Sequence, residues 1–320
     1  MTNLPHVVPD WVLWQQRNFP NSNLLMLRGD VPALVDSGFV GHAEQTAAWA
    51  QHHAPTLSLV VNTHWHSDHV GGNAELQARG VGVAASTLDA TAVNRRDPGC
   101  CSAERLDQPV QPYTVDQPLV GGEMLRLGEA DWEVIATPGH THGHLSLWQP
   151  EERLLVTGDA LSDYDVGWVD LALTGPDAAA TALTSVERLT ELQPRVLLTS
   201  HGPVPTDTGA ALAAAHRRAS RLVEDHDGAV WYGARRVFAY ALMIRGGLPV
   251  GEVEPYLLAR EWLVDAAALL HSSPEHLAAE IVDSMNASGA TLVRDGRLCA
   301  AAPHDAVPTA SLKQPWPNEW

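Results

Sequence analysis

The sequence predicts an α/β fold followed by a smaller, mainly helical part. Two observations lead to this prediction. Short apolar runs rich in β-branched residues recur through residues 1–208, and several of them end next to residue types that bind divalent metals. From Thr208 onward the apolar spacing becomes helical. We therefore expect a first domain over residues 1–208, a helical domain over residues 209–300 and an extended tail over residues 301–320.

Four of the apolar runs predict strands that end at candidate metal ligands. The first run extends from Leu57 to Val61, and the later ones begin at Trp132, Leu154 and Val196. The candidate ligands that follow these runs are His64, His66, Asp68, His69, His140, Asp159 and His201. In α/β sheets, ligands gather beyond the carboxyl ends of strands. The repetition therefore predicts a single assembled site.

The spacing of the ligands divides them between two metal ions. His64 and His66 are two residues apart in an extended segment, so both can bind one ion. Asp68 and His69 lie beyond them, before the segment from Val70 to Leu76, where we expect a helix to begin. We assign one metal to His64, His66 and His140, the other to Asp68, His69 and His201, and a bridging position to Asp159. Imidazole and carboxylate without thiolate favour zinc, with iron and manganese as alternatives.

These motifs resemble the metallo-β-lactamase superfamily in order and spacing. The matching segments are His64-x-His66-x-Asp68-His69, Thr137 to His144, Gly158-Asp159 and Ser200-His201-Gly202. The resemblance covers about residues 20–205 and implies an αβ/βα sandwich with the metals at one edge of the paired sheets. The ligand set is similar to those of glyoxalase II, N-acyl homoserine lactonases and ribonuclease Z-like enzymes, which bind two metals. It also implies that His144 supports the site and that Asp36 braces loops beneath it.

Two divalent metals predict a hydrolase. Water between two cations loses a proton near neutral pH and becomes a bridging hydroxide nucleophile, while one ion polarises the substrate oxygen. We expect Asp68 to hydrogen-bond this nucleophile or to pass its proton. Tyr164, in the loop after Asp159, is a candidate donor to an oxyanion. Trp168 in the same loop would either wall the substrate pocket or pack the loop.

Charge restricts the substrate. The net charge is −18, and residues 1–208 hold 10 arginines against 25 acidic residues. Such a field repels polyanions and argues against nucleic acid. We expect cleavage of an acyl bond, in a thioester, lactone or ester, of a small and partly apolar molecule. The alternatives are a metal-dependent endoribonuclease or phosphodiesterase, and a non-enzymatic metal or ligand sensor.

The C-terminal part shows helix and hairpin signals. Ser273-Pro274 is typical of a helix start, and Asp295-Gly296 between apolar residues predicts a hairpin turn. Helices followed by a hairpin resemble the winged-helix appendage of some metallo-β-lactamase proteins. Residues 209–300 hold 9 arginines and 11 acidic residues. This near balance disfavours DNA binding and favours a pocket wall or a homodimer contact.

The remaining sequence features concern cellular location. The N-terminal segment lacks the basic and apolar regions of a signal peptide, and no apolar run reaches the length of a membrane span. The three cysteines form neither a disulfide framework nor a Cys-x-x-Cys metal site. We therefore expect a cytoplasmic protein that acts without a membrane.

Overall fold

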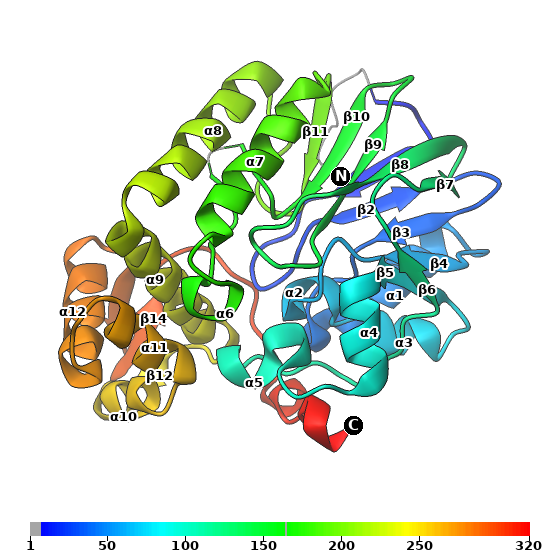
Figure 1. Cartoon of the computed structure of the whole chain (residues 1–320). Coiled ribbons are helices and arrows are strands. Elements are labelled where there is room, and N and C mark those ends of the chain that lie inside the picture. The colour runs from blue at the N-terminus through cyan, green and yellow to red at the C-terminus, as the bar shows by residue number, and fades with distance from the viewer. Residues whose placement is uncertain (1–7, 164) are drawn as a thin grey trace.

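Two β-sheets pack face to face, with helices on both outer sides (Figure 1). The computed structural model describes residues 8–163 and 165–320. Within these residues, one sheet has six strands in the order β1-β2-β3-β4-β5-β6, and the other has five in the order β11-β10-β9-β8-β7. The αβ/βα sandwich implied by the sequence is therefore confirmed.

The elements of the sandwich follow one another in two halves. The strands of the first sheet are β1 (Val12–Gln15), β2 (Leu24–Leu27), β3 (Ala33–Val35), β4 (Leu59–Val61), β5 (Gly82–Ser86) and β6 (Gln117–Leu119). The strands of the second sheet are β7 (Met124–Leu127), β8 (Ala130–Ala136), β9 (Leu145–Gln149), β10 (Leu154–Gly158) and β11 (Val196–Thr199). The helices along this part of the chain are α1 (Ala43–His53), α2 (Ser67–Val70), α3 (Asn73–Gln77), α4 (Thr87–Arg95), α5 (Ala103–Leu106), α6 (Leu171–Thr174) and α7 (Ala178–Glu191).

Alternating side chains separate the two faces of each sheet. In β2, Leu25 and Leu27 belong to the core between the sheets, whereas Leu24 and Met26 pack with the outer helices. In β8, Trp132 faces the core between the sheets, and Ile135 packs with the residues of α7. Both faces of β2 are covered, and all four of its residues are apolar and buried. The first half of β8 instead alternates, with Asp131 exposed and Glu133 half-buried between buried residues.

Strand direction brings the candidate ligands to one edge. β8 and β10 are both antiparallel to β9, and β11 is parallel to β10, so β8, β10 and β11 run in the same direction. The residues beyond their carboxyl ends include His140, Asp159 and His201. In the other sheet, β4 is parallel to both of its neighbours and leads to His64.

The sequence predicted that a helix begins within the segment from Val70 to Leu76, and α3 does so at Asn73. A further short helix, α2, begins before this segment, at Ser67, and contains Asp68 and His69. His66 is extended, with φ −65° and ψ 154°, and its carbonyl accepts the backbone N–H of His69. This short helical turn changes the chain direction directly after His66.

Beyond Thr208 the chain forms the predicted helical region. Its helices are α8 (Thr208–Glu224), α9 (His226–Ile244), α10 (Val253–Leu258), α11 (Glu261–Leu269) and α12 (Pro274–Ala287). The short strands β12 (Leu248–Pro249), β13 (Thr291–Arg294) and β14 (Arg297–Ala300) form a small sheet. Ser273 caps α12 by accepting the N–H of His276, and the hairpin turns at Asp295-Gly296, as predicted. No helix in the described ranges is both long and apolar enough to span a bilayer.

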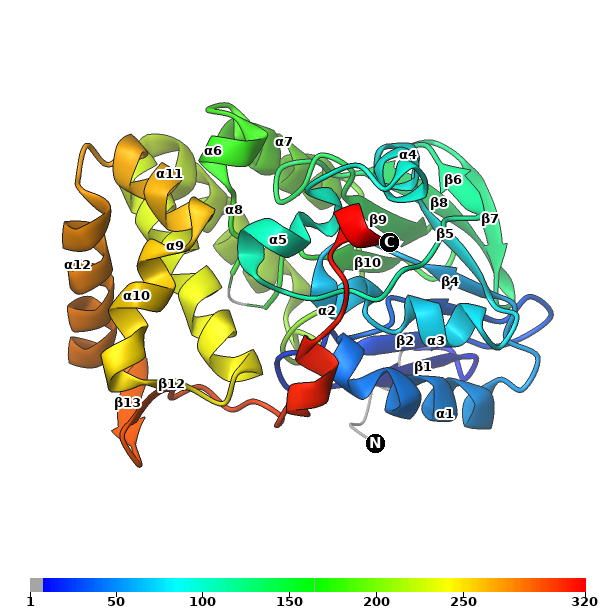
Figure 2. The same cartoon turned by 90° about the horizontal axis from the view of Figure 1, so that it is seen from below.

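The last residues return to the sandwich. Figure 2 shows the C-terminal segment, in red, running from the helical region toward the first half of the chain. Asp305 accepts a hydrogen bond from Asn18 Nδ2 at 3.0 Å, and the His42 ring contacts the Ala306 carbonyl oxygen at 3.1 Å. Trp316 and Trp320 pack against the apolar cluster on the outer face of the first sheet. The segment therefore connects both parts of the molecule.

Asp89, in the first turn of α4, is a buried carboxyl group. It is 3% exposed, and its Oδ2 atom has no hydrogen-bond partner among the described residues. Burial raises its pKa from 3.8 to about 7. Between these two pH values the native state keeps a proton that the unfolded chain has lost. The free energy of unfolding therefore falls as the pH rises through this window.

We expect Asp89→Asn to reduce this fall, because the amide fills the same space and cannot ionise. The variant should gain stability over the wild type at pH 8, by about 4 kcal/mol at most, and much less at pH 5. Urea unfolding at both pH values measures the difference. Asp131→Asn, whose side chain is 66% exposed, is the control. An unchanged pH dependence in Asp89→Asn would contradict a buried proton at this position.

Candidate metal centre

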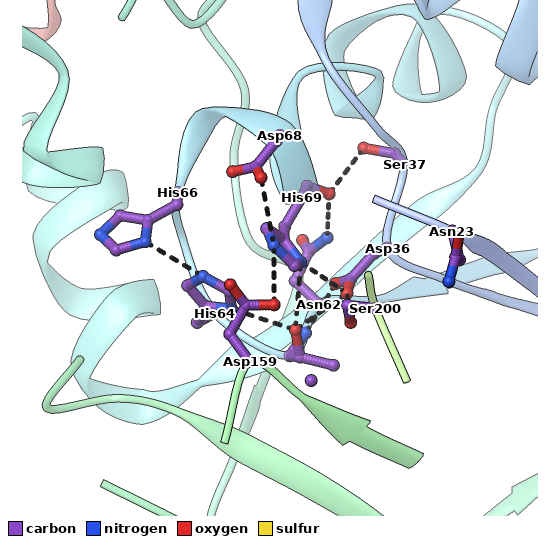
Figure 3. A network of polar contacts seen from close by, with 12 residues as sticks. Asn23, Asp36, Ser37, Asn62, His64, His66, Asp68, His69, Asp159 and Ser200 are labelled. Atoms are coloured by element: carbon purple, nitrogen blue, oxygen red, sulfur yellow. Dashed lines mark hydrogen bonds and ion pairs between the residues drawn. The ribbon is translucent and has the colours of Figure 1, made fainter. Parts of the chain in front are cut away.

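Three histidine nitrogens surround one point at the edge of the sandwich. His64 Nε2 lies 3.1 Å from His66 Nδ1, which lies 2.9 Å from His140 Nε2. All three side chains are buried, and Figure 3 shows His64 and His66 side by side. The first two come from the segment after β4, and the third follows β8. One ion could contact all three nitrogens, which lie within 4.8 Å of one another.

A second group lies beside the first. His201 Nε2 is 3.2 Å from Asp68 Oδ2, and His69 Nε2 is 3.6 Å from the same oxygen. Their ligand atoms also lie within 4.8 Å of one another. Because α2 starts directly after His66, Asp68 and His69 face this second position instead of the first.

Asp159 lies between the two groups. Its Oδ2 atom is 3.6 Å from His140 Nε2, and its Oδ1 atom is 3.5 Å from both His69 Nε2 and His201 Nε2. One carboxylate oxygen therefore faces each group. This is the arrangement that a bridging carboxylate requires.

Gly158 and His144 hold Asp159 in place. Gly158 has a left-handed φ of 54°, and a Cβ atom there would lie 2.5 Å from His144 Nε2. His144 Nε2 accepts the Asp159 N–H at 2.9 Å, and its Nδ1 contacts Thr137 Oγ1 at 2.7 Å. Burial lowers the pKa of His144 to about 3, so the ring is neutral. These contacts describe a positioning residue, whereas a direct catalytic role for His144 stays a prediction.

Further groups orient the candidate ligands. Asp36 accepts hydrogen bonds from the Thr63 N–H and hydroxyl and lies next to His69 Nδ1, each at 2.8 Å. His140 Nδ1 donates to the Trp168 carbonyl oxygen at 2.6 Å. Bonds of this kind fix the ring tautomer and leave the other nitrogen free for a metal. In His69 and His140 that nitrogen is Nε2.

The electrostatics of the site require positive charge. Burial lowers the pKa of His64 and His66 well below the usual value, so these rings are neutral. Burial also opposes the charged form of His69, but Asp68, Asp36 and Asp159 outweigh it and raise the pKa of His69 to about 10. Burial would raise the pKa of Asp159, yet His201, His69 and His140 lower it to about 2. The carboxylates are therefore ionised.

The donor atoms fit two divalent cations. His69 Nε2 and Asp159 Oδ1 are buried and face each other at 3.5 Å, and neither has a hydrogen-bond partner in the described part of the chain. Buried polar atoms without partners are rare, and a bound ion is one common explanation. Nitrogen and carboxylate oxygen are ordinary ligands of divalent transition metals. The residues present therefore agree with the two-metal assignment.

A cavity of about 250 Å³ opens over the site. The Trp168 ring stacks on His66 with centroids 5.9 Å apart and planes at 5°, and Phe19 stacks on His201 at 4.8 Å. Helix α9 contributes both polar and apolar side chains to the cavity wall. Leu106 of α5 and Gln108, just after this helix, also line the cavity. The lining residues are Phe19, His66, Asp68, Leu106, Gln108, His140, Asp159, Trp168, His201, Arg236, Val237, Ala239, Tyr240, Met243 and Ala302.

The α9 residues of this wall were not predicted from the sequence. Arg236, Tyr240 and Met243 are spaced by four and three residues, so they share one face of the helix. The spacing is visible in the sequence, but nothing there indicates which partner the face meets. Phe19 was also missed, because it follows no ligand motif. Tyr164, the predicted oxyanion donor, lies outside the described residues.

The loop after Asp159 is anchored to α8 and α9 through Asp165. This buried carboxylate pairs with Arg218 Nε at 2.8 Å and Arg236 Nη1 at 3.0 Å, and it also accepts the Tyr232 hydroxyl. A buried carboxylate with charged partners on two helices fixes the loop relative to them. The helical region therefore helps to position the loop that carries Trp168.

Comparison with known proteins yields one family and several relatives. The sequence model for the Metallo-beta-lactamase superfamily matches residues 17–201. A hydroxyacylglutathione hydrolase from Rhodobacter capsulatus is 31% identical over 68% of this chain and 73% of its own length. One from Rhodospirillum rubrum is 35% identical over 37% of this chain, which spans only 40% of that relative. A metallo-beta-lactamase family protein of Thermus thermophilus has the same fold, with TM-score 0.57 and 23% identity over 91% of this chain and 99% of its own.

We expect Asp36→Asn to weaken metal binding about 10- to 100-fold, because the charge that orients His69 and balances the bound ion is lost. Competitive titration against a chromophoric chelator measures the affinity. Asp30→Asn, at an exposed position, is the control. If the Asp36→Asn protein is folded and binds metal as tightly as the wild type, then Asp36 does not support the site in this way.

Proposed function

This chain belongs to the metallo-beta-lactamase superfamily, and we propose that it is a dinuclear metal-dependent hydrolase of a small acyl compound. One observation supports the proposal above all others. Two groups of metal ligands share Asp159 beneath a small cavity whose walls are mainly apolar. The bond to be cleaved is a thioester, lactone or ester. The ligand types favour zinc, with iron and manganese as alternatives.

The ligand groups define where the metals would be held. His64, His66 and His140 would hold one cation, Asp68, His69 and His201 the other, and Asp159 would contact both. Bound there, the cations would supply Lewis acidity and lower the pKa of a water molecule, so that hydroxide is available near neutral pH.

Asp68 is the proton acceptor in this proposal. Its carboxylate lines the cavity and lies 3.2 Å from His201 Nε2. Burial would raise the pKa of Asp68, but His69 and His201 keep it below the usual value. The carboxylate is therefore ionised, and Oδ1, the oxygen that is not assigned to the second ligand group, can accept a hydrogen bond or a proton from attacking water.

The cavity walls favour a small substrate with an apolar part and at most limited negative charge. Trp168 and Leu106 offer apolar surface, whereas Arg236 is the positively charged residue among the described cavity walls. Arg236 shares Asp165 with Arg218, so its charge is already partly balanced. A polyanion would meet little attraction here. This argues for an acyl compound over RNA.

The relatives support the same class of reaction. The name hydroxyacylglutathione hydrolase describes hydrolysis of an acyl derivative of a thiol peptide. A thioester is accordingly the first substrate type to test. The part of the cavity wall that comes from α9 lies beyond the segment that matches the superfamily, so we propose that this wall selects the thiol.

We expect purified wild-type protein to bind two metal ions and to hydrolyse thioesters or lactones. Asp159→Ala should bind fewer ions and lose at least about a hundredfold in kcat/KM, since it removes the shared ligand. Elemental analysis and a panel of thioesters, lactones, a cephalosporin and single-stranded RNA measure both properties.

Asp131→Ala is the matched control, because the Asp131 side chain is exposed and forms only a long ion pair with Arg126, at 3.6 Å, among the described residues. Turnover of RNA with no acyl turnover would replace the proposal with a nuclease. Two bound metal ions with no hydrolysis of any compound in the panel would favour the alternative of a non-enzymatic metal or ligand sensor.

A further inference from the structure

Trp168 separates the cavity over the metal ligands from a second, smaller space. Its ring stacks on His66 and meets the edge of the His140 ring, with centroids 5.7 Å apart. The same residue lines a space of about 30 Å³ that lies away from the ligands. Trp168 and Val237 are common to both linings. The indole is therefore a partition with the metal ligands on one side.

The second space lies among α6, α9 and α11, and its walls are mainly apolar. They include Val230, Ala234, Trp262, Ala266 and Leu269. Arg105 and Asp170 also line it; Arg105 pairs with Asp170 at 2.7 Å and with Asp265 at 2.5 Å, so both charged groups of the lining have a partner. An aliphatic chain could enter this space without leaving an unpaired charge buried beside it.

Gly233 leaves room beside the indole. It lies within α9, where glycine weakens the helix relative to alanine. A Cβ atom at this position would lie 3.5 Å from Trp168 Cε3 and from the Val169 carbonyl oxygen, which is ordinary contact. The backbone therefore does not require glycine here. Its effect is to keep the side of α9 that faces the indole free of a side chain.

The main cavity combines an apolar ring and a charged side chain in its lining. Trp168 covers His66 and His140, which belong to the first ligand group. Arg236 lines both this cavity and a neighbouring small one, each time together with Asp159 and His201. A substrate that lies across both ligand groups would thus place its apolar end at Trp168 and its polar end toward Arg236.

We propose that the Trp168 indole is the end wall of the acyl site and sets the maximum length of the acyl chain. The substrate class is then a short straight-chain or compact acyl compound, and the space among α6, α9 and α11 becomes accessible only when the indole is removed. This inference rests on the proposed acyl hydrolase function. His140 Nδ1 donates to the backbone carbonyl oxygen of Trp168, so replacement of the Trp168 side chain preserves this contact.

The test compares wild type, Trp168→Phe and Trp168→Ala with straight-chain carboxylates of increasing length, by calorimetry on metal-loaded protein. Affinity should rise about fourfold per methylene until the chain meets the end wall. We expect the affinity to stop rising at the shortest chain in the wild type and at a longer chain in Trp168→Phe. In Trp168→Ala it should stop rising about two or more carbons beyond the wild-type limit. Among p-nitrophenyl esters from acetate to decanoate, the chain length with the highest kcat/KM should increase in the same order.

The double variant Trp168→Ala/Ala266→Leu is the matched control, because Ala266 lines the second space and not the main cavity. It should restore a limit close to that of the wild type. An identical length limit in wild type and Trp168→Ala would overturn the inference, as would a loss of affinity that is the same at every length. Metal content and melting temperature confirm that each protein is folded. If Trp168→Ala does not fold, Trp168→Phe alone decides: a length limit longer than that of the wild type supports the inference, and an unchanged limit contradicts it.

Failure of this inference can be distinguished from failure of the proposed function. Wild-type turnover of acyl esters with an unchanged length limit in the variants leaves the hydrolase proposal intact and removes the role of Trp168. If the wild type hydrolyses no acyl compound and binds no carboxylate chain, both proposals fall.

Discussion

Negative charge buried around His69 dominates the energetics of the site. Asp36 lies 2.8 Å from the His69 Nδ1 atom, and Asp159 and Asp68 face its Nε2 atom at 3.5 and 3.6 Å. Buried carboxylates without positive partners would cost several kcal/mol each. The raised pKa of His69, about 10, expresses the same demand for positive charge. Divalent cations bound there would satisfy it, so we expect metal binding to stabilise this edge of the fold.

The sandwich places the candidate metal ligands at the ends of separate strands, where cations could bind. Neighbouring residues hold several of these ligands through hydrogen bonds. β10 ends at Gly158, whose left-handed backbone lets His144 approach and hold the Asp159 N–H. Asp36 supports His69 from the loop after β3, and the Trp168 carbonyl supports His140. Hydrogen bonds of this kind hold ligand side chains in one orientation. The candidate ligands are thus held by neighbours that are themselves buried or hydrogen-bonded.

Most residues that line the cavity are not candidate metal ligands. Helix α9 supplies Arg236, Tyr240 and Met243, and the C-terminal segment supplies Ala302. Asp165 joins the loop that carries Trp168 to α8 and α9 through its pairs with Arg218 and Arg236. The candidate metal ligands and most of the other residues that line the cavity therefore come from different parts of the sequence. This separation allows the walls to change while the metal chemistry is kept.

Local sequence was sufficient to predict the strand runs before the candidate ligands, the α12 cap at Ser273 and the turn at Asp295-Gly296, because each depends on short-range spacing or hydrogen bonds. It also selected candidate ligands that the structure brings close together. The three-dimensional structure was needed to show that α2 starts at Ser67, that Asp165 binds two helices, and that Trp168 stacks on His66. It was also needed to show which face of α9 meets the cavity. These features depend on contacts between residues far apart in the chain, and periodicity indicates that a face is buried without indicating what it meets.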